Sequence, residues 1–167
     1  MSKLSNQVVL QKITARFGDQ ITIPTEPPGL LSFETSKENI IDVLTYLKDD
    51  KELQFNFLTD LTGIHYPEQA LPIGVVYHIH SLTNNVRVRV KVFLSDDTPT
   101  IPSATKLWEG ANWMERETYD FFGINFEGHP NLKRILNVDE MTVFPMRKEY
   151  PLEDPNRVDK KDYFFGR

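Results

Sequence analysis

Apolar residues recur at helical spacing in two stretches of the N-terminal half of the chain. The first covers residues 6–17, and Gly18 directly after it supplies a stop signal. The second is predicted to begin at a capping box, in which the Thr35 hydroxyl and the Glu38 carboxylate each satisfy a free amide, and to run to about Lys48. The apolar positions are Val9, Leu10, Ile13 and Phe17 in the first helix and Ile40, Ile41, Leu44 and Leu47 in the second.

A third helix is predicted through residues 107–122. Ser103 is its predicted N-cap, Gly110 is a potential break, and Gly123 supplies its stop. One arc of this helix is suited to face the core of the domain. That arc consists of Leu107, Ala111, Met114, Thr118, Phe121 and Phe122.

Alternation of apolar and polar residues predicts short strands at residues 20–23, 31–33 and 53–57. The clearest β signal covers residues 73–94, where Asn84 and Asn85 tolerate the left-handed conformation that a two-residue hairpin turn requires. This turn leaves one face of the hairpin apolar and the other largely polar. It pairs Ile79 with Val90, Tyr77 with Val92, Val75 with Leu94, His80 with Arg89, and His78 with Lys91.

The composition is that of a soluble globular protein. The 167 residues favour one domain with a real core, and 40% are hydrophobic and 26% charged. A net charge of −5 argues against nucleic-acid binding, which needs a basic patch. No apolar run approaches the roughly 20 residues that span a bilayer, and the first five residues lack the apolar core of a secretion signal. Because the chain has no cysteine, we expect a cytoplasmic protein without a redox centre of its own.

Residues 1–150 are predicted to form a single domain, and residues 151–167 an extended C-terminal arm. The arm has no amphipathic period, two prolines, alternating charges and an apolar Tyr163-Phe164-Phe165. Such a tail is either disordered or laid along a partner.

The polar face of the third helix places charges beside large aromatic rings. Arg116 and Asp120 are four residues apart, so the simplest interpretation is an exposed ion pair worth about 0.2–0.5 kcal/mol. However, Trp113 and Tyr119 lie beside these charges, and each ring can bury roughly 150–250 Å². Rings and an arginine among carboxylates are typical of a protein–protein hot spot. We therefore expect residues 113–151 to be covered by another polypeptide.

Signals for catalysis or metal binding are weak. His78 and His80 share a strand face, but cationic residues oppose them and no carboxylate is placed to complete a metal site. His129, in a Gly/Pro-rich turn, is either a general base or a hydrogen-bonded structural group.

The carboxylates of Glu115, Glu117 and Asp120 could act as a catalytic group. Glu115 and Glu117, however, diverge by about 200° around a helix and cannot share a substrate. The cationic side chains that could bind an anion or form interface ion pairs are Arg134, Arg147 and Lys148.

Two blocks of the sequence resemble a known signature. One begins at Glu115-Arg116-Glu117 and continues through Asp120-Phe121-Phe122-Gly123-Ile124, and the other is Gly128-His129-Pro130 followed by Arg134-Ile135-Leu136. Together they are similar to the C subunit, the 30-kilodalton subunit, of NADH:quinone oxidoreductase, respiratory complex I. The similarity extends to residues 75–78, 87–92, 111–113 and 147–152. After residue 136 the chain departs from the family, with residues 139–144 in place of an Asp-Trp-x-Gly turn.

The resemblance implies an α+β fold, a two-layer sandwich with helices packed on a mostly antiparallel (mixed) sheet. It also implies a non-catalytic structural and assembly subunit of the peripheral arm, which supports electron transfer from NADH to quinone coupled to proton translocation. FMN, iron–sulfur clusters, NADH and quinone belong to the complex, and none is bound by this subunit. The implied partners are subunits D and B, with the I subunit as a further candidate, on the cytoplasmic face of the inner membrane.

The implied site is a partner interface, without catalytic, cofactor-binding or metal residues of its own. One alternative is the equivalent subunit of a related membrane-bound hydrogenase. Another is an independent hydrolase or lyase that uses His129 with Glu117 or Asp120. The predicted interface residues are Trp113, Glu115, Arg116, Glu117, Tyr119, Asp120, His129, Arg134, Arg147, Lys148 and Tyr150.

Overall fold

A computed structural model describes residues 4–24 and 29–150. The predicted arm, residues 151–167, lies outside the described residues. The first half of the chain forms α1 (Asn6–Phe17), the 3-10 helix η1 (Gly18–Gln20), β1 (Ile21–Thr22), β2 (Leu31–Thr35), α2 (Ile40–Asp49) and β3 (Phe57–His65). The second half forms β4 (Ile73–Ser81), β5 (Val86–Leu94), β6 (Thr100–Pro102), α3 (Ala111–Phe122) and β7 (Asn125–Glu127).

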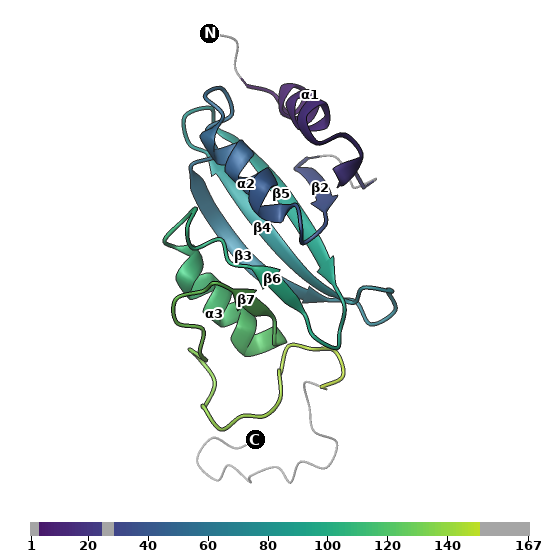
Figure 1. Ribbon diagram of the computed structural model, residues 1–167, viewed down its shortest axis with the longest axis vertical. Helices are drawn as coiled ribbons and strands as arrows, with labels where there is room; N and C mark the ends of the chain where they lie inside the picture. The colour runs from purple at the N-terminus through teal and green to yellow at the C-terminus, as the bar shows by residue number, and fades with distance from the viewer. Residues whose placement is uncertain (1–3, 25–28, 151–167) are drawn as a thin grey trace, which may run out of the picture.

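The strands form one mixed sheet of order β1-β2-β5-β4-β3 and a separate parallel pair, β6 and β7. Within the larger sheet β2 and β5 are parallel, and the other neighbours are antiparallel. Figure 1 shows α2 lying across the sheet and α3 beside the edge strand β3, with which it is packed. The predicted α+β fold, with helices on a mostly antiparallel sheet, is confirmed.

The core lies between the sheet and the helices. Val75, Tyr77 and Ile79 of β4 are fully buried, because alternate residues of a strand point to the same face. Their neighbours on β5 and the apolar side of α2 complete this core. These residues are Val88, Val90 and Val92 on β5 and Ile40, Val43, Leu44 and Leu47 on α2.

The β4–β5 hairpin forms with a register two residues away from the predicted one. Ser81 pairs with Val86, so the loop contains four residues rather than two. Asn85 has φ +54, as expected, but the Asn84 side chain donates hydrogen bonds to the Glu52 and Leu53 carbonyls. These bonds tie the loop to the segment after α2. The shift by two preserves the faces, so Ile79 pairs with Val88, Tyr77 with Val90, Val75 with Val92, His80 with Arg87, and His78 with Arg89.

Two local predictions in the first half are wrong. Thr35 ends β2 and its hydroxyl donates to the Gln20 carbonyl, so the capping box does not form and α2 begins at Ile40. The strand predicted at residues 53–57 begins only at Phe57 and continues to His65. Residues 53–55 are instead a buried turn region, in which Leu53 and Phe55 are apolar anchors rather than strand positions.

The third helix is shorter at its start than the pattern predicts. It begins at Ala111, while residues 105–107 form a turn. Gly123, with φ +74, ends it as predicted. A close approach to the sheet occurs at Gly63 of β3, where any Cβ would overlap the Phe122 ring. The absence of a side chain at Gly63 therefore sets how closely α3 packs on β3.

Candidate functional site

The polar residues of α3 face segments of the same chain. Glu115 is fully buried and accepts hydrogen bonds from the Ser103 hydroxyl and the Ala104 amide, both at 2.6 Å. Ser103 is therefore not the N-cap of α3, because its hydroxyl binds a side chain in the helix. Burial raises the pKa of Glu115 to about 7, against the lowering effect of these two hydrogen bonds. Burial, together with the charge of Glu115, also raises the pKa of Tyr77.

Arg116 fixes the segment that follows the His129 turn. Its Nε donates to the Lys133 carbonyl at 3.1 Å and its Nη2 to the Arg134 carbonyl at 3.0 Å. The guanidinium carbon lies 5.2 Å from the centre of the Trp113 ring, in a cation–π arrangement. The simple ion pair between Arg116 and Asp120 is thus replaced by contacts of each residue with the later segment.

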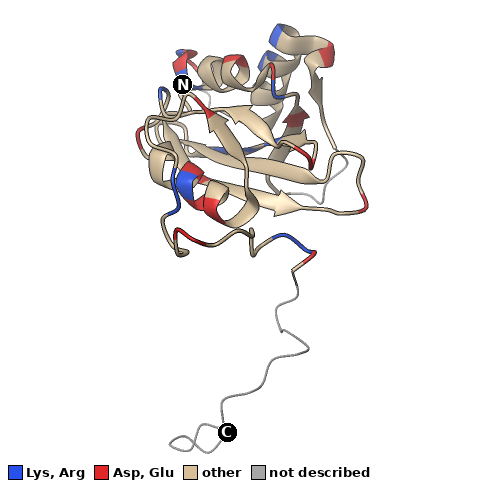
Figure 2. Ribbon diagram, turned by 60° about the horizontal axis from the view of Figure 1, so that its bottom comes forward, with Lys and Arg blue, Asp and Glu red and all other residues tan. Residues whose placement is uncertain are grey.

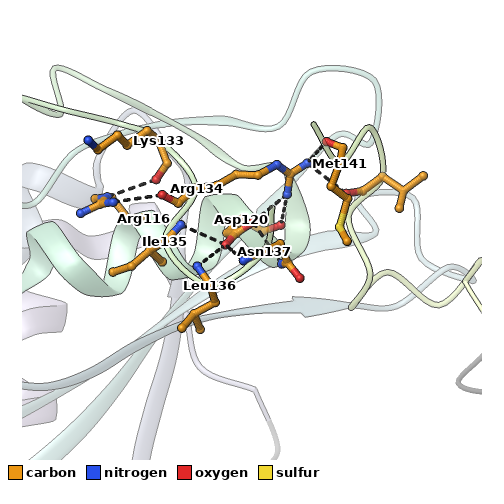
Figure 3. Close-up of polar contacts among 9 residues, drawn as sticks. Arg116, Asp120, Lys133, Arg134, Ile135, Leu136, Asn137 and Met141 are labelled. Carbon is orange, nitrogen blue, oxygen red and sulfur yellow. Dashed lines mark hydrogen bonds and ion pairs between the residues drawn. The ribbon is translucent and has the colours of Figure 1, made fainter. Parts of the chain in front are cut away.

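Asp120 is the centre of a clamp on residues 134–137 (Figure 3). Its Oδ2 accepts the amides of Ile135, Leu136 and Asn137 at 3.1, 2.8 and 2.9 Å. Its Oδ1 accepts Arg134 Nη1 at 2.6 Å and the Asn137 side-chain amide at 3.1 Å. Burial raises the pKa of this carboxyl, but the amides and the guanidinium together outweigh burial and hold the pKa well below its usual range.

Arg134 extends the clamp towards the end of the described chain. Beyond the Asp120 carboxylate, its guanidinium donates to the carbonyls of Asp120, Met141 and Val143 at 2.8, 2.7 and 3.1 Å. Its guanidinium carbon also lies 5.1 Å from the centre of the Phe144 ring. Four acceptors on one planar group fix the path of residues 134–143.

A second set of contacts holds residues 144–150. Arg147 Nε donates to the Phe122 carbonyl at 2.7 Å, and its Nη1 pairs with Asp96 at 2.8 Å. The Lys148 amide donates to Nδ1 of the buried His65 at 2.9 Å. The Tyr119 and Phe144 rings meet edge to face at 6.2 Å, and the Phe144 ring lies so close to Gly123 that a Cβ there would collide with it.

His129 is held in a structural arrangement. Its Nδ1 accepts the Asn131 amide at 3.0 Å, which leaves Nε2 as the donor to the Asn112 carbonyl at 3.0 Å. Neither nitrogen is available as a general base in this arrangement. Glu117 is exposed and Asp120 is engaged in its clamp, so the structure does not assemble the three residues of the hydrolase alternative.

The structure separates nine of the eleven predicted interface residues into two groups and leaves Tyr119 and His129 half-buried. Glu115, Arg116 and Asp120 are buried, and Arg134 and Arg147 are mostly covered, by the chain itself. For these ionic groups the expectation that another polypeptide supplies the cover is wrong, since residues 96, 103–104, 122 and 133–143 satisfy them. Whether a partner touches any predicted interface residue stays a prediction. The exposed members are Trp113, Glu117, Lys148 and Tyr150.

Several residues that build the site were not predicted as site residues from the sequence. Ser103, Asn137, Asp96 and His65 lie 12 to 83 residues along the chain from the groups they bind. The signals that marked the region were Gly123, the Glu-Arg-Glu block and the predicted interface residues around them. Within residues 4–24 and 29–150 no cluster of three or more His, Cys, Asp or Glu side chains is suited to a metal ion. His78 instead accepts a hydrogen bond from Arg89 Nε at 2.9 Å.

Among the residues that the structure describes, no helix has the length and apolar character needed to cross a membrane.

Comparison with known proteins gives matches over most of the chain. The NADH-quinone oxidoreductase C subunit of Citrifermentans bemidjiense is 45% identical over 152 residues, which are 91% of this chain and 93% of that protein. The protein of the same name from Roseiflexus sp. strain RS-1 is 45% identical over 149 residues, 89% of this chain and 86% of that protein.

Solved structures show the same fold. The trypsin-resistant fragment (1–134) of Nqo5 has a TM-score of 0.65 and 32% identity, with 75% of this chain and 98% of that chain covered. A chain in the structure of the membrane-bound sulfane sulfur reductase, an archaeal respiratory membrane complex, has a TM-score of 0.74. At 21% identity, over 93% of this chain and 96% of that chain, this second likeness shows the fold alone.

The family model described as respiratory-chain NADH dehydrogenase, 30 Kd subunit, matches residues 33–156. This range contains the charged α3 helix and both segments that it binds. The chain belongs to the family of the 30-kilodalton subunit of respiratory-chain NADH dehydrogenase.

Proposed function

We propose that this chain is the C subunit of an NADH:quinone oxidoreductase and acts as a structural and assembly subunit without an active site of its own. The observation that carries this proposal is the 45% identity to the C subunit of Citrifermentans bemidjiense over nearly the full length of both chains. In this function the subunit supports electron transfer from NADH to quinone, coupled to proton translocation, by holding other subunits of the peripheral arm in place.

The geometry of α3 supports a structural function. Arg116 and Asp120 form hydrogen bonds with backbone carbonyls and amides of the same chain, and both nitrogens of His129 form hydrogen bonds as well. Groups used in this way order a polypeptide segment. They do not converge on a space where a substrate would bind.

The partners that we propose are subunits D and B, with the I subunit as a further candidate, and the position is the cytoplasmic face of the inner membrane. FMN, the iron–sulfur clusters, NADH and quinone are proposed to bind elsewhere in the complex. The lack of cysteine in this chain supports the assignment of the clusters to other subunits, since thiolates are their usual ligands.

Affinity purification of the tagged chain from its native membranes tests the proposal. We expect subunits D and B to co-purify, and NADH:quinone reductase activity of the membranes to fall when the gene is deleted and to return on complementation. Recovery of a nickel–iron subunit in place of a quinone module would support the hydrogenase alternative. Catalytic activity of the pure chain that is lost in His129→Ala would support the independent enzyme.

A further inference from the structure

We propose that Trp113, Leu136 and Val138, surrounded by an acidic rim, form a docking surface for one protein subunit whose apolar recess is bordered by lysine and arginine. This inference rests on the proposed function, and it names the contact residues and the chemistry of the partner. In the proposed docking surface, the buried ionic residues of α3 position the segment, and the exposed apolar side chains contact the partner.

The Asp120 clamp turns apolar side chains outward. The amides of residues 135–137 and the Asn137 side chain all point at one buried carboxylate. Figure 3 shows the Leu136 side chain directed away from Asp120. Leu136 is 64% exposed and Val138 63% exposed, in a segment whose path Arg134 fixes on both sides. A surface held in one conformation loses little conformational entropy on binding.

Trp113 belongs to the same surface. The Arg116 guanidinium lies over the Trp113 ring and donates to the carbonyls of residues 133 and 134, so the ring and the clamped segment contact the same group. Trp113 is 61% exposed. A single exposed apolar residue is ordinary on a protein surface, but an exposed Trp joined through Arg116 to a segment with two exposed aliphatic side chains has the composition of an interface centre.

The exposed charged side chains of residues 109–141, which we take as the rim, are mostly acidic, because the arginines of this range bind the chain itself. Arg116 and Arg134 donate hydrogen bonds to other groups of the same chain. Lys133 is therefore the exposed cationic side chain of residues 109–141. Figure 2 shows acidic residues on α3 and on the loop beside it. The exposed acidic side chains of this range are Glu109, Glu117, Glu127, Asp139 and Glu140.

This charge selects among the possible occupants. A second copy of the chain would place acidic rim against acidic rim, since a two-fold interface brings the same patch together, and the whole chain carries a net charge of −5. An anionic lipid surface would also be repelled. A protein partner with cationic residues around an apolar recess complements both the centre and the rim.

Photo-crosslinking in the intact complex tests the apolar centre. A benzophenone amino acid replaces Leu136 in the tagged full-length chain, and the same amino acid replaces Leu82, which is 58% exposed in the β4–β5 loop, as the matched control. We expect position 136 to crosslink to a peptide of one subunit of the complex that contains Lys or Arg, and position 82 not to reach that peptide. A crosslink to a second copy of the chain, or no product from position 136, would overturn the proposal.

Charge reversal tests the acidic rim. The double variant Glu117→Lys with Asp139→Lys is compared with Glu68→Lys with Asp97→Lys, which changes the total charge equally at exposed positions of other loops. We expect only the first variant to reduce recovery of the crosslinked subunit, by about tenfold at low ionic strength, with a smaller loss at high salt. Melting temperatures of the purified chains test whether both variants fold. Equal recovery with the two variants would contradict the rim.

These experiments separate the two proposals. If the unaltered chain recovers no subunit of an NADH:quinone oxidoreductase, the proposed function fails. If the unaltered chain recovers the complex, while position 136 gives no crosslink or the rim variant binds as well as its control, only the docking surface fails.

Discussion

Helices α2 and α3 both pack against the rest of the fold, but they bury opposite kinds of side chain. The residues that α2 buries are Ile40, Val43, Leu44 and Leu47. The residues that α3 buries are Ala111, Glu115, Arg116, Thr118, Asp120 and Phe122. Helix α2 is held mainly by the burial of apolar side chains, an interaction that has no preferred direction. Helix α3 contributes buried charged groups, each of which needs its own hydrogen-bonding partner.

The difference teaches what each helix specifies. Apolar side chains such as Leu44 tolerate other well-packed neighbours, so the buried face of α2 adds stability with little demand for a particular partner. The carboxylates and guanidinium of α3 find their partners in residues 103–104 and 133–137, which are otherwise without regular structure. Helix α3 is therefore a template on which an irregular segment acquires one conformation.

The largest effect should come from removing the centre of this template. Asp120→Ala leaves Arg134 without its carboxylate and three backbone amides without an acceptor. We expect a loss of about 3–5 kcal/mol in the free energy of unfolding, measured by chemical denaturation, since one partner of a buried pair is removed. Amides 135–137 should also lose their protection in hydrogen exchange.

Two variants provide the controls for this change. Asp120→Asn keeps one oxygen, but its amide nitrogen must face the donors of Arg134 or Asn137, so part of the loss should remain. Leu44→Ala in α2 should cost about 2–5 kcal/mol through the cavity it creates. If Leu44→Ala exposed amides 135–137 locally as strongly as Asp120→Ala does, the contrast between the helices would be wrong.

The contrast between these helices also explains how much could be predicted from sequence. Helical period and the glycines at positions 18 and 123 located α1 and the end of α3, and strand alternation located the β4–β5 hairpin. These signals depend on neighbours in the sequence. The observed hairpin loop places Asn84 against residues 52 and 53, a contact distant in sequence that the local pattern does not contain.

The partners of the charged residues could not be predicted for the same reason. The Glu-Arg-Glu block marked a dense set of charges, but an ion pair four residues away and a carbonyl seventeen residues away are equally consistent with Arg116. Only the fold shows that the chain itself covers these groups. A composition typical of an interface therefore also describes a helix that organises an irregular segment of its own chain.

The next largest effect is a pH dependence of stability from Glu115. Its folded-state pKa of about 7 exceeds its ordinary value of 4.5, so the folded chain binds the proton more tightly than the unfolded chain. The stabilising contribution is complete below pH 4.5 and is lost as pH rises through about 7. Within this window it should change by at most about 1.4 kcal/mol per pH unit.

Glu115→Gln isolates this group from the other titrating residues. We expect the difference in unfolding free energy between the unaltered chain and this variant to fall between pH 4.5 and about 7, and to be flat on either side. Denaturation curves across this range measure it. A constant difference throughout would show that Glu115 does not titrate as its burial requires.

A smaller effect is expected where α3 meets the sheet. Gly63→Ala places a methyl group against the Phe122 ring, so α3 must move away from β3. We expect a loss of about 1–3 kcal/mol, measured as a fall in melting temperature. In the double variant with Phe122→Leu, the smaller side chain should recover part of the loss. Gly110→Ala, where a Cβ meets nothing within 4 Å, is the matched control and should leave the melting temperature nearly unchanged.

The smallest effect on the isolated chain should come from Trp113, on the exposed side of α3. Trp113→Ala removes the ring on which Arg116 stacks, but the guanidinium keeps its two carbonyl acceptors. We expect a loss of only about 0.5–1 kcal/mol in the free energy of unfolding, the usual size of an exposed cation–π contact.

Binding of Trp113→Ala to the purified remainder of the complex should weaken by about 2 kcal/mol or more if the ring is an interface anchor. Trp113→Phe keeps a ring, so its losses in folding and in binding should lie between those of the unaltered chain and of Trp113→Ala. Equal losses in folding and binding for Trp113→Ala would mean that this side of α3 serves the fold alone.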